Sequence, residues 1–128
     1  MTSEELIQYW KKSAIDALDT AKTLNRPGKY HHSLFFLHLA IEKIIKAGYV
    51  KLRNETPSPI HDLVRLTEAT GSPMDQKRVK ELSEISSFNI SARYDDYKQQ
   101  FYKKATSEYA QKWLEIGEKI FKEMESML

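Results

Sequence analysis

The hydrophobic pattern is most informative over residues 34–50, which read LFFLHLAIEKIIKAGYV. Twelve of these seventeen residues are apolar, and a helix that is apolar nearly all round lies in a core or an interface. His38, Glu42 and Lys46 recur at every fourth position, so these three residues, the polar stripe, stack along one side of the helix, with Lys43 close by. Charges near an interior are costly unless they are paired or used. The pattern therefore predicts either the central helix of a bundle with ion pairs or the wall of a polar site.

Start and stop signals divide the rest of the chain into further helices. Thr2 with Glu5 forms a capping box, and Ser58 followed by Pro59 offers an N-cap and a first residue for the third helix. Five helices are predicted to begin near Thr2, His31, Ile60, Asp75 and Thr106, and the first three to end near Leu24, Leu52 and Thr70. Residues 88–104 form an aromatic-rich connection whose structure the pattern leaves undefined. No segment alternates as a strand does, so we expect an all-α, up-and-down bundle of four or five helices.

Length and composition indicate one small domain covering residues 1–128. The chain has no cysteine, which excludes disulfides, thiolate catalysis and cysteine zinc sites and fits a cytoplasmic location. The charged N-terminus is not typical of a signal peptide, and charges interrupt the longest apolar stretch, so no membrane span is expected. A net charge of +2 is too small to indicate nucleic acid by itself. His31 and His32 are adjacent and do not face one way, and no metal site is predicted.

Three segments resemble the HEPN domain family. They are FFLHLAIEKIIKAGYVKL at residues 35–52, PIHDLVRL at residues 59–66 and FNISARYDDYKQQFYKKAT at residues 88–106. The family pattern has an aromatic residue, His or Gln, then A-[VI]-E-K, two hydrophobic residues and K-A; later come P-x-H-[DN]-L and an A-R-Y-P segment. The three motifs occur in the family's order, and Asp95 stands where the family usually has proline.

The resemblance implies a four- or five-helix domain that forms a homodimer in bacteria or archaea. HEPN proteins of this size are often encoded beside a minimal nucleotidyltransferase, as the two halves of a toxin–antitoxin-like system. Some relatives bind nucleotides and others cut RNA.

The RNA-cutting branch of the family carries Arg, four to six residues, and then His. Arg53 and His61 are separated by seven residues, and the segment between them contains two prolines. Arg26 and His31 have four residues between them but lie in the first interhelical turn. The standard ribonuclease motif is therefore not found in its expected place.

His61 is the first candidate for a ligand contact. It falls in the first turn of the predicted third helix, where free backbone N–H groups and the helix dipole favour an anion such as phosphate. The alternative interpretation is that His61 and Asp62 simply cap and pack the start of this helix.

Arg93 and Tyr94 are the second candidates. Arginine can grip phosphate with two hydrogen bonds, and an adjacent aromatic ring can stack on a base. Aromatic and basic residues are interleaved around them, as in proteins that bind single strands; these are Phe88, Tyr97, Lys98, Phe101, Tyr102, Lys103 and Lys104. The alternative is that the rings anchor this connection to the bundle while Arg93 pairs with a carboxylate.

The polar stripe also has two interpretations. In the first, Glu42 and Lys46 form an ion pair in the favourable i, i+4 orientation, within the chain or across a dimer. In the second, Lys43 and Lys46 face a nucleotide phosphate across the dimer, with His38 beside them. Trp10 and Trp113 recur at core spacing and are predicted to pack in the bundle.

Together with the resemblance, these residues predict a dimeric HEPN-type module that binds RNA or a nucleotide such as ATP and requires no cofactor. We expect it to be the partner of a minimal nucleotidyltransferase. Its phosphate contacts would come from His61, Arg93, Lys43 and Lys46, with Tyr94 on the base. One alternative is an atypical, metal-independent endoribonuclease that uses His61 and Arg93. Another is a purely structural adaptor for the nucleotidyltransferase.

Overall fold

The computed structural model describes the backbone of residues 1–93 and 95–128 and the side chains of residues 1–89 and 99–128. This part of the chain contains six helices and no strand. The helices are α1 (Ser3–Asn25), α2 (Tyr30–Arg53), α3 (Leu63–Thr70), α4 (Gln76–Arg93), α5 (Asp95–Lys104) and α6 (Ser107–Glu125). None of the described helices is both long enough and apolar enough to cross a membrane.

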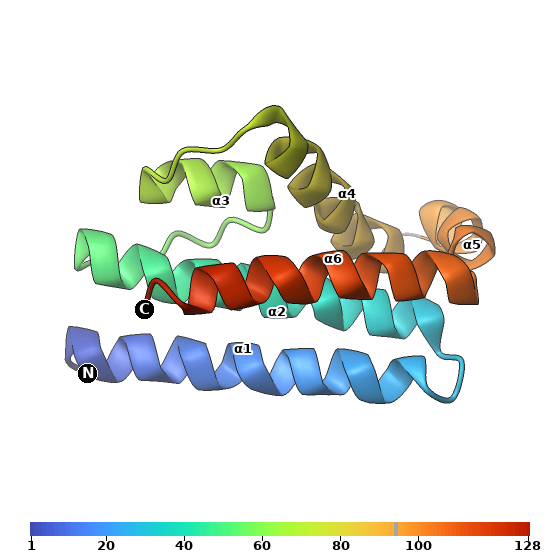
Figure 1. The fold of residues 1–128 in the computed structure, drawn as a ribbon, viewed down its shortest axis with the longest axis horizontal. Coiled ribbons are helices and arrows are strands. Elements are labelled where there is room, and N and C mark those ends of the chain that lie inside the picture. Colours follow the sequence, from blue (N-terminus) through green and yellow to red (C-terminus); the bar gives the residue numbers. More distant parts are fainter. Residues whose placement is uncertain (94) are drawn as a thin grey trace.

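The long helices alternate in direction along the chain (Figure 1). α1 runs antiparallel to α2, α4 crosses back at an angle, and α6 returns in the direction of α2. Contacts at the ends agree, because Lys51 near the end of α2 donates to the carbonyls of Met127 and Leu128 just beyond α6. The predicted up-and-down bundle is thus confirmed, with α3 and α5 as short helices in its two later connections.

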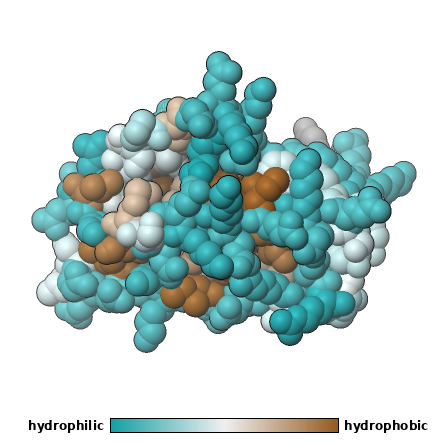
Figure 2. All heavy atoms as spheres, in the orientation of Figure 1, coloured by the Kyte–Doolittle hydropathy of each residue, from teal (hydrophilic) through white to brown (hydrophobic). Residues whose placement is uncertain are grey.

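α2 is the central helix, because α1, α3, α4 and α6 all contact it. Leu34, Leu37 and Ile41 of α2 are completely buried. This position explains why residues 34–50 are apolar nearly all round. The face shown in Figure 2 is mostly hydrophilic with separate apolar patches, as is usual for a folded domain.

Most predicted boundaries are confirmed, and one is wrong. Thr2 and Glu5 form the capping box, and α3 ends at Gly71, whose positive φ of 81° suits glycine. However, α3 begins at Leu63 rather than at residue 60. Its N-cap is Asp62, whose carboxylate accepts the N–H groups of Val64 and Arg65. Asp62 is as good an N-cap as Ser58, and the preceding residues are held by contacts with α2 that local signals do not contain.

The segment 88–104, which the pattern left undefined, is largely helical. It forms the end of α4 and all of α5. Phe88 on α4 and Phe101 on α5 are buried and stack with ring centroids 5.5 Å apart. Lys104 then bonds Glu84 of α4 at 3.0 Å, and Tyr109 of α6 donates to the same carboxylate at 2.6 Å. The predicted anchoring of this connection by aromatic residues is confirmed for Phe101.

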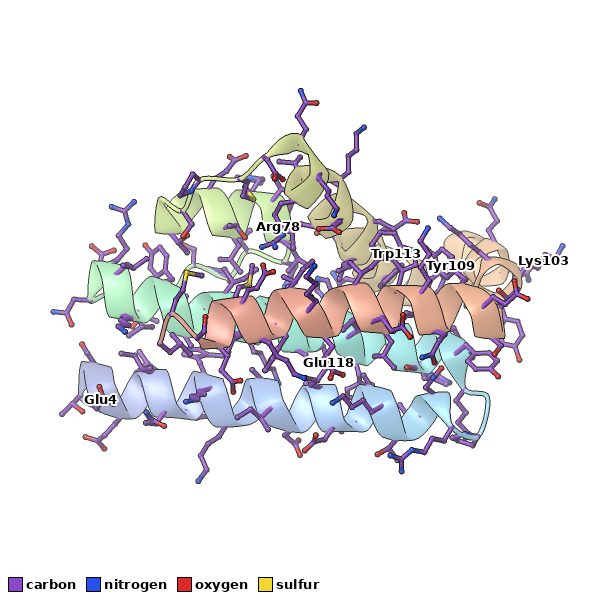
Figure 3. All side chains as sticks on the ribbon, in the orientation of Figure 1. Glu4, Arg78, Lys103, Tyr109, Trp113 and Glu118 are labelled. Carbon is purple, nitrogen blue, oxygen red and sulfur yellow. The ribbon has the colours of Figure 1, made fainter. Side chains whose placement is uncertain are left out.

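α4 and α6 are also joined by side chains. Figure 3 shows Arg78 on α4 and Tyr109 and Trp113 on α6 between these two helices. Arg78 pairs with Glu123 of α6, and the Trp113 ring lies 6.2 Å from the ring of Phe88. Trp113 therefore packs in the bundle, as its spacing predicted.

α2 and α6 approach closely at Gly117. A Cβ atom added there would lie 2.5 Å from Cδ1 of Leu37, which is completely buried. Gly48 on α2 is the opposite case, because a Cβ there would have no atom within 4 Å. Gly48 lines an open groove of about 550 Å³ between α2, α3 and the end of α6.

These two helical glycines give a matched test of the packing. Alanine favours a helix over glycine by about 1 kcal/mol, so Gly48→Ala should raise the free energy of unfolding by roughly that amount. Gly117→Ala should lower it by about 1 kcal/mol, because overpacking against Leu37 costs about 1–3 kcal/mol. Urea unfolding followed by circular dichroism measures both values. A stabilising Gly117→Ala would contradict the close approach of α2 and α6.

Candidate functional site

The polar stripe and His61 meet at the carboxylate of Glu42. Glu42 is only 5% exposed. Its Oε2 accepts a hydrogen bond from Lys46 Nζ at 3.0 Å, and its Oε1 accepts one from His61 Nδ1 at 3.0 Å. Both oxygens of a buried carboxylate are therefore satisfied, which is what its burial requires.

The ionisation of Glu42 follows from these partners. Burial alone raises the pKa of Glu42, but hydrogen bonds from His61 and Lys46, together with the positive charge of Lys46, hold the pKa below its ordinary value of 4.5. Glu42 is therefore an anion at neutral pH, although it is buried.

His38 holds the same segment by its main chain. The carbonyl oxygen of His61 can only accept, so His38 Nε2, 3.0 Å away, carries the proton and donates it. The same nitrogen lies 3.8 Å from Glu42 Oε1. Residue 61 is thus fixed twice, by its carbonyl and by its ring, and the polar stripe sets the position of the connection between α2 and α3.

Lys46 is enclosed by α1. It is only 6% exposed, and its Nζ lies 5.3 Å from the centroid of the Trp10 ring, where a cation is attracted to the ring face. Of the two interpretations of the polar stripe, the structure therefore shows ion pairing within the chain.

The ring of His61 has one nitrogen, Nε2, that does not bond Glu42. Its side chain is about half exposed (50%), and Nδ1 carries the proton donated to Glu42. In the neutral ring, Nε2 is consequently the unprotonated nitrogen. No hydrogen bond to Nε2 occurs within the described part of the chain. This nitrogen can accept a proton or, once protonated, donate one to an oxyanion.

The backbone amides at the start of α3 are already bonded. Asp62 accepts from Val64 and Arg65, and the N–H of Leu63 donates to Ser86 Oγ of α4 at 2.9 Å. A phosphate that used these N–H groups would have to displace Asp62 or Ser86. The predicted capping role belongs to Asp62, whereas His61 is held by α2.

Comparison with known proteins identifies the family. The family model of the HEPN domain matches residues 7–127, which is nearly the whole chain. The chain belongs to the HEPN family. The crystal structure of TT1696 from Thermus thermophilus resembles it with a TM-score of 0.79, 20% sequence identity, and coverage of 95% of this chain and 98% of that chain. At this identity the likeness concerns the fold. No curated protein sequence matches.

The remaining predicted site residues of this HEPN domain are placed less fully. Arg93 ends α4, and the side chains of Arg93 and Tyr94 lie outside the described residues. Lys43 on α2 is partly exposed and forms no ion pair with Glu42 in the described structure. The structure thus brings His38, Lys46 and His61 together, and leaves the roles of Lys43, Arg93 and Tyr94 as predictions.

Glu42 is the site residue whose importance the sequence understated. It was visible only as a partner for Lys46 four residues on. Its bond to His61 joins two helices, and the sole sequence signal for it is that the E-K and P-x-H motifs occur in one family pattern. Although His38, Glu42 and His61 lie close together, no group of three such side chains in the described residues is arranged to hold a metal ion.

Replacing one partner of the Glu42–Lys46 pair should lower the free energy of unfolding more than replacing both. Lys46→Met leaves the buried carboxylate short of a donor and should lower the free energy of unfolding by about 2–3 kcal/mol. The double variant Glu42→Leu with Lys46→Met removes both charges and should lose less than Lys46→Met alone. The loss that remains measures the bond between Glu42 and His61. Urea unfolding of the single and double variants forms a double-mutant cycle.

The exposed pair of Lys22 and Glu118, 2.9 Å apart, provides the control for this cycle. Lys22→Met should cost under about 1 kcal/mol because water screens that pair. A Lys46→Met variant that is equally harmless would contradict the buried ion pair.

Stability should depend on pH through Glu42. Its pKa is lower folded than unfolded, so its contribution is complete above pH 4.5 and is lost as pH falls through the folded pKa. The stability difference between wild type and Glu42→Gln should therefore shrink as pH is lowered from about 5 to 3. Urea midpoints measured across this range test the prediction, and a constant difference would refute it.

Proposed function

We propose that this HEPN domain binds the phosphate of a nucleotide or of RNA at the exposed edge of His61. The observation that supports this is the half-exposed imidazole whose Nδ1 is held by the buried Glu42 carboxylate. A ring oriented in this way needs no rearrangement before its Nε2 meets a ligand. When protonated, it donates a charge-assisted hydrogen bond to a phosphate oxygen.

In this proposal the residues of the polar stripe hold His61 in position and do not touch the ligand. Lys46 neutralises Glu42, and His38 holds the carbonyl of residue 61. Arg93 and Lys43 supply further positive charge to the phosphate, and Tyr94 packs on the base. Arg93 lies seven residues after Ser86 on α4, about 10 Å along the helix axis. Ser86 accepts the N–H of Leu63, two residues after His61. ATP or a similar nucleotide is the proposed ligand.

A homodimer is part of the proposed function. Phe35 and Leu39 lie on the opposite side of α2 from Leu37, which faces α6 at Gly117. Both are apolar and remain partly exposed beside the polar stripe. This face suits a second subunit. The proposed partner of the dimer is a minimal nucleotidyltransferase, in a cytoplasmic two-gene system of the toxin–antitoxin kind.

A second candidate function is metal-independent RNA cleavage. It is favoured by the Glu42–His61 pair itself, because a carboxylate-oriented imidazole can take a proton from a ribose 2′-hydroxyl as a general base. Arg93 would then stabilise the charge that develops on the phosphate. The alternative without chemistry is a structural adaptor that only docks the transferase.

Calorimetric titration with ATP tests the binding site. His61→Asn keeps an N–H donor for Glu42 but removes Nε2, so the protein should stay folded and lose at least about tenfold in ATP affinity. Arg93→Ala should weaken binding comparably, whereas the exposed Lys12→Ala on α1 should not change it. No heat with the wild-type protein, or equal heat with His61→Asn, would refute the proposed contact.

The same variants separate the alternatives. RNA cleavage in the presence of a chelator that is lost in His61→Asn would favour the endoribonuclease, and intact RNA at high protein concentration would eliminate it. Tight transferase binding that is indifferent to both variants, with no nucleotide binding, would select the adaptor.

A further inference from the structure

Three aromatic rings gather where the start of α2 meets the end of α5. The ring of Tyr102 lies 4.6 Å from that of His31, and the ring of His31 lies 4.0 Å from that of His32. We call these three residues the ring group. α5 and the turn between α1 and α2 lie at the same end of the bundle (Figure 1), and Lys103 projects there as well (Figure 3). His31 and Tyr102 are far apart in the sequence and lie side by side only in the folded chain.

The ring group faces water rather than the core. Tyr102 is 63% exposed and His32 is exposed, whereas the neighbouring Phe101 is 4% exposed and stacks on Phe88. Phe101 thus packs α5 against the bundle, and the next residue, Tyr102, is exposed to solvent.

Three exposed cations are close to the ring group in the sequence. Arg26 and Lys29 lie in the turn just before His31, and Lys103 follows Tyr102; all three are exposed. None of the three forms an ion pair within the part of the chain that the structure describes, whereas the adjacent Lys104 is bound to Glu84. Exposed rings beside uncommitted cations have the chemistry that single-stranded nucleic acids need, because bases stack on the rings and phosphates meet the cations.

We infer that this end of the bundle binds a single strand of nucleic acid, with bases on the ring group and phosphates near Arg26, Lys29 and Lys103. This inference does not rest on the proposed phosphate contact at His61.

Fluorescence anisotropy with a labelled oligoadenylate of about ten nucleotides tests the surface. Tyr102→Ala should weaken binding by about tenfold, the usual loss when one stacking ring is removed. Tyr102→Phe keeps the ring and should bind as the wild type does. Tyr9→Ala is the control, because Tyr9 is also exposed (54%) but lies on α1 near the opposite end. Circular dichroism confirms that each variant is folded.

Several results would overturn the inference. They are no oligonucleotide binding by the wild type at roughly 10⁻⁴ M, where non-specific binding is ordinarily seen, unchanged binding by Tyr102→Ala, and equal binding of a duplex whose paired bases cannot reach the rings. Calorimetry with ATP separates this failure from that of the proposed function. Tyr102→Ala should leave the ATP affinity unchanged, and His61→Asn should reduce it.

The cations provide an independent readout. Lys29→Glu combined with Lys103→Glu should weaken the oligonucleotide complex. The slope of log affinity against log salt should fall by about one for each phosphate that the protein no longer neutralises. An unchanged slope would place the strand elsewhere.

Discussion

The buried carboxylate of Glu42 is the constraint on which the arrangement of this domain depends. Four helices contact α2, and Glu42 is almost completely buried, so it must find its donors in the protein. Lys46 supplies one from the next turn, and His61 supplies the other from a different segment. The second bond fixes the connection that precedes α3. The N–H of Leu63 then meets Ser86 and aligns α3 with α4. The hydrogen bonds that a buried carboxylate requires thus help to place α2, α3 and α4 relative to one another.

The same bonds connect stability with function. Holding Nδ1 of His61 leaves Nε2 directed away from the carboxylate, on a ring that is half exposed. A residue that only closed a buried ion-pair network would gain nothing from that exposure. Lys46 and His38, in contrast, are buried and have partners, so in the proposed function they do not touch the ligand. The proposed division of roles follows from burial: one side chain touches phosphate, and the others hold it in position.

Local chemistry predicted the helices well. Thr2, Glu5 and Gly71 act through neighbours a few residues away, and their signals can be read without a fold. The start of α3 was misplaced because Ser58-Pro59 and Asp62 are both acceptable signals, and contacts of His61 with α2 decide between them. Phe101 and Tyr102 illustrate the same limit. Both belong to one aromatic and basic run, but the rotation of α5 against the core buries the first and exposes the second. The link between Glu42 and His61 could not be predicted from spacing, since it joins separate elements.

Long-range ¹H–¹⁵N NMR of the histidine rings, with and without ATP, tests the Glu42–His61 pair most directly. We expect His61 to carry its proton on Nδ1 and His38 to carry its proton on Nε2. ATP should shift the Nε2 signal of His61 but not the signals of His38. Glu42→Gln should disturb the His61 tautomer. A His61 ring protonated on Nε2, insensitive to Glu42→Gln and to ATP, would contradict the central role assigned to the Glu42–His61 pair.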